Sequence, residues 1–157
     1  KMSVEKGYNL KPSRSNGIKV TVPFKDLAAV EVTGSGDLWN SSTITARNFS
    51  TKLTGSGDIK LDLAVENLEG AVTGSGDILL SGKARDFNCK VTGSGDFKAY
   101  GLKAENVEAT VMGSGDIQIS ANKKLKAKVM GSGDIKYKGN PENQDFKTSG
   151  SGSISSN

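Results

Sequence analysis

The sequence contains no histidine and only one cysteine, Cys89, among its 157 residues. Without histidine the chain cannot build a Ser-His-Asp or Cys-His catalytic arrangement, and a single cysteine with carboxylates is a poor ligand set for zinc. One cysteine also excludes an intrachain disulfide bond. We therefore expect no catalytic, cofactor-binding or metal-binding residues and no cofactor, and we expect Cys89 to be a small buried side chain.

Long apolar runs, aromatic residues and basic clusters are also scarce. No hydrophobic stretch approaches the about 20 residues that a transmembrane helix needs, so we expect no transmembrane segment. The 21 Lys and Arg residues against 17 Asp and Glu give a net charge of +4, but the basic residues are scattered along the chain and aromatic residues make up only 6% of it. This composition argues against a nucleic-acid partner.

Glycine, in contrast, is abundant, and many of the 20 glycines belong to a repeated tetrapeptide. The motif GSGD begins at Gly34, Gly55, Gly74, Gly93, Gly113 and Gly131, and a degenerate GSGS begins at Gly150, so that successive copies are 21, 19, 19, 20, 18 and 19 residues apart. A steady period of this length is typical of one turn of a solenoid. GSGD lacks the third glycine of a dinucleotide-binding fingerprint.

Apolar residues alternate with polar ones on both sides of each motif, as in a β-strand with one buried face. The positions expected to face inward are those immediately after the aspartate (Leu38, Ile59, Ile78, Phe97, Ile117, Ile135), two residues further on (Asn40, Leu61, Leu80, Ala99, Ile119, Tyr137), two residues before the motif (Val32, Leu53, Val72, Val91, Val111, Val129) and six before it (Ala28, Phe49, Leu68, Phe87, Val107, Leu125). A column of mostly small residues stands four before the motif (Val30, Thr51, Gly70, Cys89, Ala109, Ala127). Glycine and aspartate suit a sharp turn. The sequence therefore predicts an all-β, single-stranded β-helix with about 19 residues per rung.

We predict a single domain over residues 1–157. Residues 1–17 are polar and form an N-terminal end piece, residues 18–138 form the regular rungs, beginning with a strand at 18–23, and residues 139–157 form a C-terminal cap. The cap is expected because the apolar register is lost after Gly139 and the last motif lacks its aspartate. Solenoids need such caps to protect the last rung.

The repeated GSGD followed by Ile, a preceding strand that contains VP, and the endings GDIKYKGNP and GSGSI resemble the putative auto-transporter adhesin head GIN domain family over about residues 18–155. This is a family of bacterial cell-envelope proteins. The resemblance implies a right-handed β-helix akin to the pectin-lyase fold and an extracytoplasmic location in the periplasm, on the outer membrane surface or outside the cell. It also implies an adhesive role without demonstrated catalysis.

We therefore favour a non-enzymatic surface or binding module whose ligand is a cell-surface carbohydrate, another surface polymer or a protein. Two alternatives stay open. A polysaccharide-active β-helix enzyme would need a unique cluster of carboxylates, whereas these aspartates recur in every rung. A calcium-stabilised solenoid would use the aspartates as ligands, but GSGD differs from calcium-binding nonapeptide repeats in the offset of its aspartate and in its period.

Several outward positions are candidates for contact with a ligand. Trp39 and Tyr100 are expected to point outward, where either ring could stack on a sugar, whereas Tyr137 is expected to point inward. Lysines are expected on both sides of alternate corners, at Lys52, Lys90 and Lys128 and at Lys60, Lys98 and Lys136, where they would favour anionic surface polymers weakly.

The motif aspartates themselves should stack in a column: Asp37, Asp58, Asp77, Asp96, Asp116 and Asp134. Neighbouring carboxylates about 4.8 Å apart repel one another, so the column needs compensation. We expect backbone amides of the glycine turn and nearby lysines, rather than metal ions, to supply it. The column is thus predicted to be a structural ladder.

Overall fold

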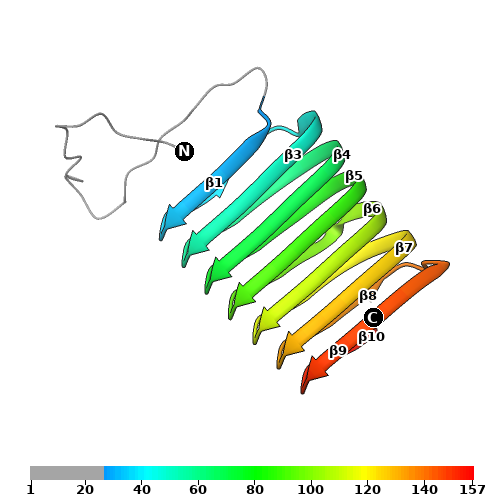
Figure 1. The fold of residues 1–157 in the computed structure, drawn as a ribbon. Helices are drawn as coiled ribbons and strands as arrows, with labels where there is room; N and C mark the ends of the chain where they lie inside the picture. Colours follow the sequence, from blue (N-terminus) through cyan, green and yellow to red (C-terminus); the bar gives the residue numbers. More distant parts are fainter. Residues whose placement is uncertain (1–26) are drawn as a thin grey trace.

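The computed structural model describes residues 27–157, which form ten β-strands and no helix (Figure 1). The end piece expected at 1–17 and the strand expected at 18–23 lie outside these residues. The strands are β1 (Ala29–Gly34), β2 (Leu38–Trp39), β3 (Ile44–Gly55), β4 (Ile59–Gly74), β5 (Ile78–Gly93), β6 (Phe97–Gly113), β7 (Ile117–Gly131), β8 (Ile135–Lys138), β9 (Asn143–Gly150) and β10 (Ile154–Ser156).

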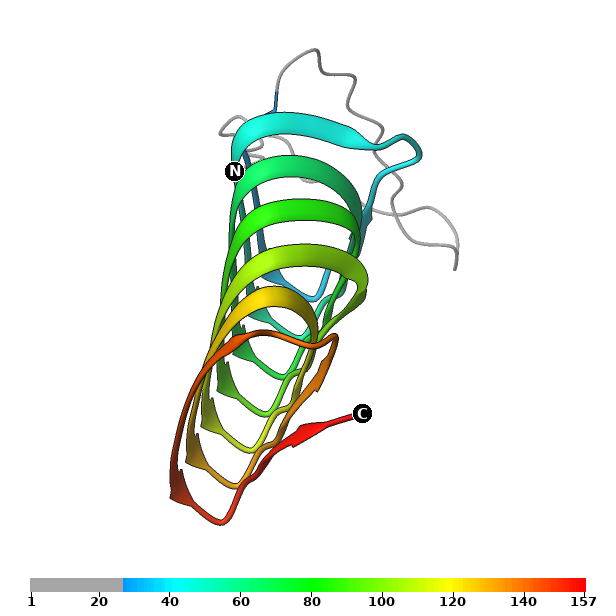
Figure 2. The same cartoon turned by 90° about the vertical axis from the view of Figure 1, so that its right-hand side faces the viewer.

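Successive strands stack as turns of one solenoid, and every strand pair is parallel. The order is β1-β3-β4-β5-β6-β7-β8-β10, with β2 also paired to β4 and β9 to β7. Figure 2, turned by 90° from Figure 1, shows β4 to β7 each bending around most of a turn. The first glycines of the motifs pair with one another from Gly34 through to Gly150. The predicted all-β solenoid with a repeat of about 19 residues is therefore confirmed.

The interior is a narrow apolar stack formed by the predicted inward columns. The residues that follow the motif aspartates, Ile59, Ile78, Phe97, Ile117 and Ile135, are all fully buried. Gly70, in the column of small residues, lies against the ring of Phe97, and a Cβ atom at Gly70 would overlap that ring. The residues of this column are therefore small because large side chains such as Phe97 reach them from the opposite side of the interior.

The first described turn is less regular than the prediction. Ala28 was expected to face inward but is exposed, because it precedes β1 and has a described neighbouring turn on one side only. Asn40 is half-buried, and its side chain pairs with the backbone of Asp62, donating to the carbonyl at 2.9 Å and accepting from the amide at 3.0 Å. The side chain of Asn40 thereby extends the short pairing of β2 with β4.

At the C-terminal end, the backbone of β9 pairs with β7 in the same register as the earlier strands, although all the residues of β9 are exposed. Phe146 pairs with Ala127 in the column of small residues and is 38% exposed. Its ring lies 5.6 Å, centroid to centroid, from the ring of Tyr137, which is half-buried and packs on the core as expected for an inward position. This aromatic pair covers part of the last turn of the core.

Candidate functional site

Each GSGD corner has the same backbone arrangement, and a Cβ atom on either glycine would overlap the neighbouring turn in the stacked copies. The first glycine of every motif has a φ between 109° and 137°, a region that other residues rarely adopt. Its carbonyl accepts the amides of the serine and the second glycine of the next turn, as Gly34 accepts from Ser56 at 2.9 Å and Gly57 at 3.2 Å. A Cβ atom on Gly57 would overlap the carbonyl of Gly36 one turn away. The corner is therefore fixed by stacking contacts between turns.

The motif aspartates form a ladder along this corner. One carboxylate oxygen, Oδ1, of each aspartate accepts the backbone amide of the equivalent residue in the next turn at 2.8 to 3.2 Å, from Asp37 through to Asp134, whose partner is Ser153. The compensating amides were expected to come from the glycine turn. They come instead from the next aspartate, because in-register parallel stacking places that amide directly over the carboxylate.

Hydrogen bonds and the ammonium group of Lys98 offset the electrostatic repulsion between the stacked aspartate carboxylates. The backbone amide and the hydroxyl of Ser153 hold the pKa of Asp134 below its usual value. The ammonium group of Lys98 lies 2.6 Å from the carboxylate of Asp77 and 3.4 Å from that of Asp96, and the hydrogen bond to Asp77 is the main reason that the pKa of Lys98 is raised. Within residues 27–157, no group of three or more His, Cys, Asp or Glu side chains is arranged to hold a metal ion.

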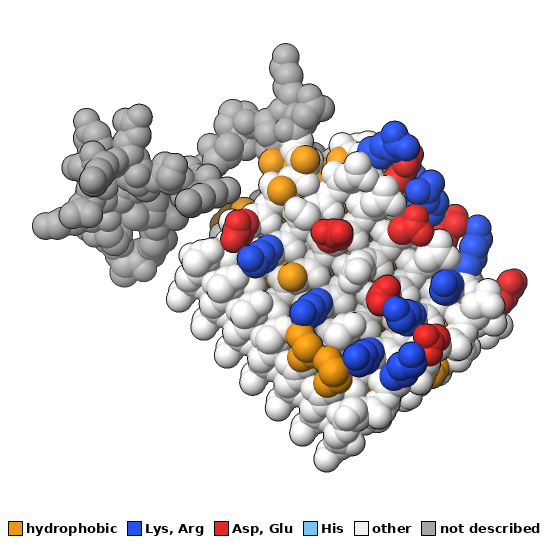
Figure 3. Space-filling model, in the orientation of Figure 1, with side chains coloured by type: hydrophobic (Ala, Val, Ile, Leu, Met, Phe, Trp, Pro, Cys, Tyr) orange, Lys and Arg blue, Asp and Glu red, His pale blue; other side chains and the backbone are white. Residues whose placement is uncertain are grey.

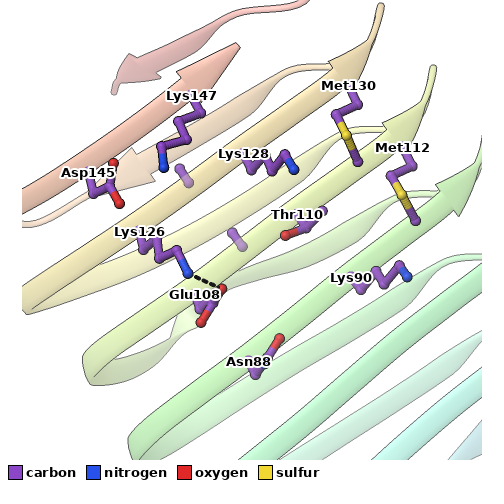
Figure 4. A pocket seen from close by; sticks show the side chains of 12 residues that line it. Asn88, Lys90, Glu108, Thr110, Met112, Lys126, Lys128, Met130, Asp145 and Lys147 are labelled. Carbon is purple, nitrogen blue, oxygen red and sulfur yellow. Dashed lines mark hydrogen bonds and ion pairs between the residues drawn. The ribbon is translucent and has the colours of Figure 1, made fainter. Parts of the chain in front are cut away.

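A shallow groove of about 490 Å³ crosses the outer face of β5, β6, β7 and β9 (Figure 4). The strand register sets three columns side by side across it, and we call the surface formed by them the basic groove. One column carries Asn88, Glu108, Lys126 and Asp145, the second carries Lys90, Thr110, Lys128 and Lys147, and the third carries Met112 and Met130.

The basic groove contains four lysines and two acidic residues, and among residues 27–157 only Lys126 of these lysines has an ion-pair partner. The ammonium group of Lys126 lies 2.7 Å from the carboxylate of Glu108, a hydrogen bond that raises the pKa of Lys126. Lys90, Lys128 and Lys147 are exposed and form no ion pair with any residue between 27 and 157. Figure 3 shows several basic side chains on this face. Three unpaired positive charges therefore stand in one column.

A second hollow of about 370 Å³ adjoins the basic groove and shares Asn88, Glu108 and Lys126 with it. Amide and carboxylate groups line it, and they bond along their own column: Asn106 donates to Asp86 at 2.7 Å. Lysine side chains and hydrogen-bonding groups therefore lie together on this face, a combination suited to binding an anionic ligand.

The sequence matches the family described as "Putative auto-transporter adhesin, head GIN domain" over residues 1–141. The chain belongs to this family. The regular β-solenoid described above is thus the fold of a head GIN domain.

Three solved structures of similar proteins come from two bacteria. A putative adhesin of Bacteroides fragilis NCTC 9343 shares 33% identity with this head GIN domain, covering 83% of this chain and 61% of its own, with a TM-score of 0.77. A putative lipid binding protein of Parabacteroides distasonis ATCC 8503 shares 32% identity, covering 82% and 52%, with a TM-score of 0.80. A putative adhesin of that organism shares 26% identity, covering 84% and 56%, with a TM-score of 0.78.

This head GIN domain therefore spans between 52% and 61% of the length of those proteins. Two of those proteins are described as putative adhesins and one as a putative lipid binding protein. No curated protein is significantly similar to the chain. Among residues 27–157, no helix has the length and apolar character needed to cross a membrane.

The residues of this head GIN domain that the sequence suggested for ligand contact lie in different parts of the solenoid. Lys90 and Lys128 lie in the basic groove, whereas Lys98 is held at the aspartate ladder. Trp39 is 58% exposed near the N-terminal end of the described stack. Tyr100 is half-buried, and the ammonium group of Lys138 lies 4.5 Å from the centroid of its ring. The two aromatic residues lie in different turns and columns, so they form no common sugar-stacking platform.

The sequence interpretation missed Lys126, Lys147, Asp145 and the two methionines of the basic groove. Lys147 stands three residues before Gly150, as Lys128 stands three before Gly131. Counting back from the degenerate GSGS motif in the register of the other copies would have placed Lys147 in the same column.

Proposed function

We propose that this head GIN domain is a non-enzymatic, extracytoplasmic binding module that attaches to cell-surface glycans or other surface polymers. The observation that carries the proposal is the basic groove, where Lys90, Lys128 and Lys147 stand in one column and form no ion pair with any of the described residues. Extended faces of this kind are the usual binding surfaces of solenoids. The adhesin names of the family and of two solved relatives support the same role.

Hydrolysis of the bound polymer is less well supported by the acidic residues present. A glycoside hydrolase of the common kind uses two carboxyl groups on either side of the bond, one of them kept protonated by its surroundings. In the basic groove, the carboxylate of Glu108 is held by Lys126. At the C-terminal end of the aspartate ladder, hydrogen bonds from Ser153 hold the pKa of Asp134 below its usual value and so favour its charged form.

Calcium stabilisation is also less well supported by the ladder. Calcium takes six to eight oxygen ligands. From Asp37 to Asp134, one carboxylate oxygen of each aspartate already accepts a backbone amide.

The test is to apply the purified chain to an array of bacterial and host surface polysaccharides and to analyse the same polymers for cleavage products. We expect retention on a subset of the polymers and no new chain ends. Heat-unfolded protein is the control for non-specific adsorption. Release of oligosaccharides would replace the binding role with an enzymatic one, and a lack of retention on every polymer would contradict the proposal.

A further inference from the structure

We propose that the basic groove binds one linear acidic polysaccharide that runs along the axis of the solenoid across β5, β6, β7 and β9. This inference rests on the proposed binding function and specifies its ligand class and site. It follows from three features of the groove: the direction of the lysine column, the chemistry of the columns on either side, and the position of the large exposed apolar side chains outside the groove.

The lysine column runs along the stacking axis rather than along a strand. Lys90, Thr110, Lys128 and Lys147 are consecutive partners in the parallel ladder. Because paired strands are about 4.8 Å apart, the backbone positions of the first and last lysines are separated by about 14 Å. A linear chain with repeated negative charges can reach all three ammonium groups together, whereas a single acidic monosaccharide cannot.

The columns beside the lysines can contact both the C–H groups and the hydroxyl groups of a sugar. On the corner side, the half-buried thioethers of Met112 and Met130 offer an apolar, polarisable surface to the C–H groups of a sugar ring. Within and beside the lysine column, the hydroxyl of Thr110 and the amide of Asn88 can exchange hydrogen bonds with sugar hydroxyls. Pockets that combine apolar surface with a few polar groups of this kind are typical ligand sites.

A broad anionic surface such as a membrane fits this wall less well than a linear chain does. The column beside the lysines carries Glu69, Glu108 and Asp145, which such a surface would have to face at the same time. Among the described residues, the large apolar side chains that are exposed are Trp39, Leu79 and Phe146. None of these lines the basic groove, so this wall offers no large side chain to insert among lipids.

The test compares binding of the chain to alginate, a polymer of carboxylate-bearing sugars, with binding to neutral dextran and to vesicles of phosphatidylglycerol and phosphatidylcholine. A groove variant carries Lys90→Gln, Lys128→Gln and Lys147→Gln. A matched control carries Lys83→Gln, Lys103→Gln and Lys123→Gln, which remove the same charge from exposed lysines that do not line the groove. Circular dichroism and thermal unfolding verify that both variants fold.

We expect the wild-type chain to bind alginate more tightly than dextran, and to lose at least about tenfold in affinity between 50 and 300 mM salt because the lysine charges become screened. The groove variant should lose at least about tenfold in affinity for alginate, and the control variant less than about threefold. Equal losses in the two variants, or vesicle binding that depends on the groove lysines while alginate binding does not, would overturn this inference. Retention on neutral polymers alone would overturn it and leave the proposed function standing, whereas failure to bind any polymer would remove both.

Discussion

Single residues in the narrow interior are constrained by the wall that faces them. The column of small residues accepts Gly70, Cys89, Ala109 and Ala127, all of them buried. Burial raises the pKa of the Cys89 thiol, so this cysteine stays protonated and serves as a compact apolar side chain. Thr51 occupies the same column, and among residues 27–157 its hydroxyl is the buried side-chain polar group that lacks a hydrogen-bond partner. The column therefore accommodates small apolar side chains but offers no hydrogen-bond partner to a hydroxyl group at Thr51.

Replacing Thr51 with valine should stabilise the protein. The Thr51→Val change keeps the branched shape and removes a hydroxyl that pays a desolvation cost without a hydrogen bond, so we expect a gain of about 1 kcal/mol in the free energy of unfolding. Chemical denaturation measures it. Thr54→Val, at a half-buried position of the same strand, is the control and should change stability less. A loss of stability in Thr51→Val would show that the hydroxyl of Thr51 does form a hydrogen bond in the folded protein.

The pKa of Asp134 depends on Ser153 and can be followed by NMR titration of the carboxyl carbons. Because the folded pKa of Asp134 is lowered, its contribution to stability is present above the unfolded value of about 3.9 and is lost as the pH falls through the folded value. Ser153→Ala removes the hydroxyl bond of 2.9 Å and keeps the backbone bond of 2.8 Å. We expect the pKa of Asp134 to rise but to stay below its usual value. Ser156→Ala, further along β10, should leave it unchanged.

At the scale of strands and corners, the period and the alternation were sufficient to predict the turns. Side-chain alternation places Ile59 and Ile78 inside, and the recurrence of GSGD fixes which residues of successive turns pair. The partner of each aspartate was not predicted, because it depends on how the backbone of one turn lies over the next. The position of an amide over the carboxylate of the preceding turn arises only when two corners stack, so it cannot be read from the residues of one repeat.

The second glycine of the motif should tolerate alanine only where no turn stacks against it. At Gly95 a Cβ atom would overlap the carbonyl oxygen of Gly76, whereas no described atom lies within 4 Å of the same position on Gly36. We expect Gly95→Ala to destabilise the protein by about 3 kcal/mol through forced separation of the turns, and Gly36→Ala by less than about 1. Thermal and denaturant unfolding measure both. Equal effects would mean that the glycine is needed for its own backbone conformation.

The whole molecule is a stack in which each turn is supported by its neighbours, and this explains why the basic groove was only partly predictable. Lys90 and Lys128 follow from the regular motifs, but the groove also needs Lys147 from β9. In that strand the positions in register with buried residues of β7 hold Gln144, Phe146 and Thr148, all of them exposed. The sequence of that turn is typical of a cap. Its backbone nevertheless continues the ladder, so the groove extends to the last turns of the stack.

Because support is local, damage at the C-terminal end should stay at that end. Phe146→Ala removes the ring that contacts Tyr137 over the last turn of the core. We expect faster amide hydrogen exchange in β8 and β9, with little change in β4 and β5, since stability in a solenoid is a sum of neighbour contacts. Lys147→Ala, at the next and outward position of β9, is the control and should leave exchange unchanged in all four strands. Uniform acceleration along the chain in Phe146→Ala would show instead that the whole stack unfolds as one cooperative unit.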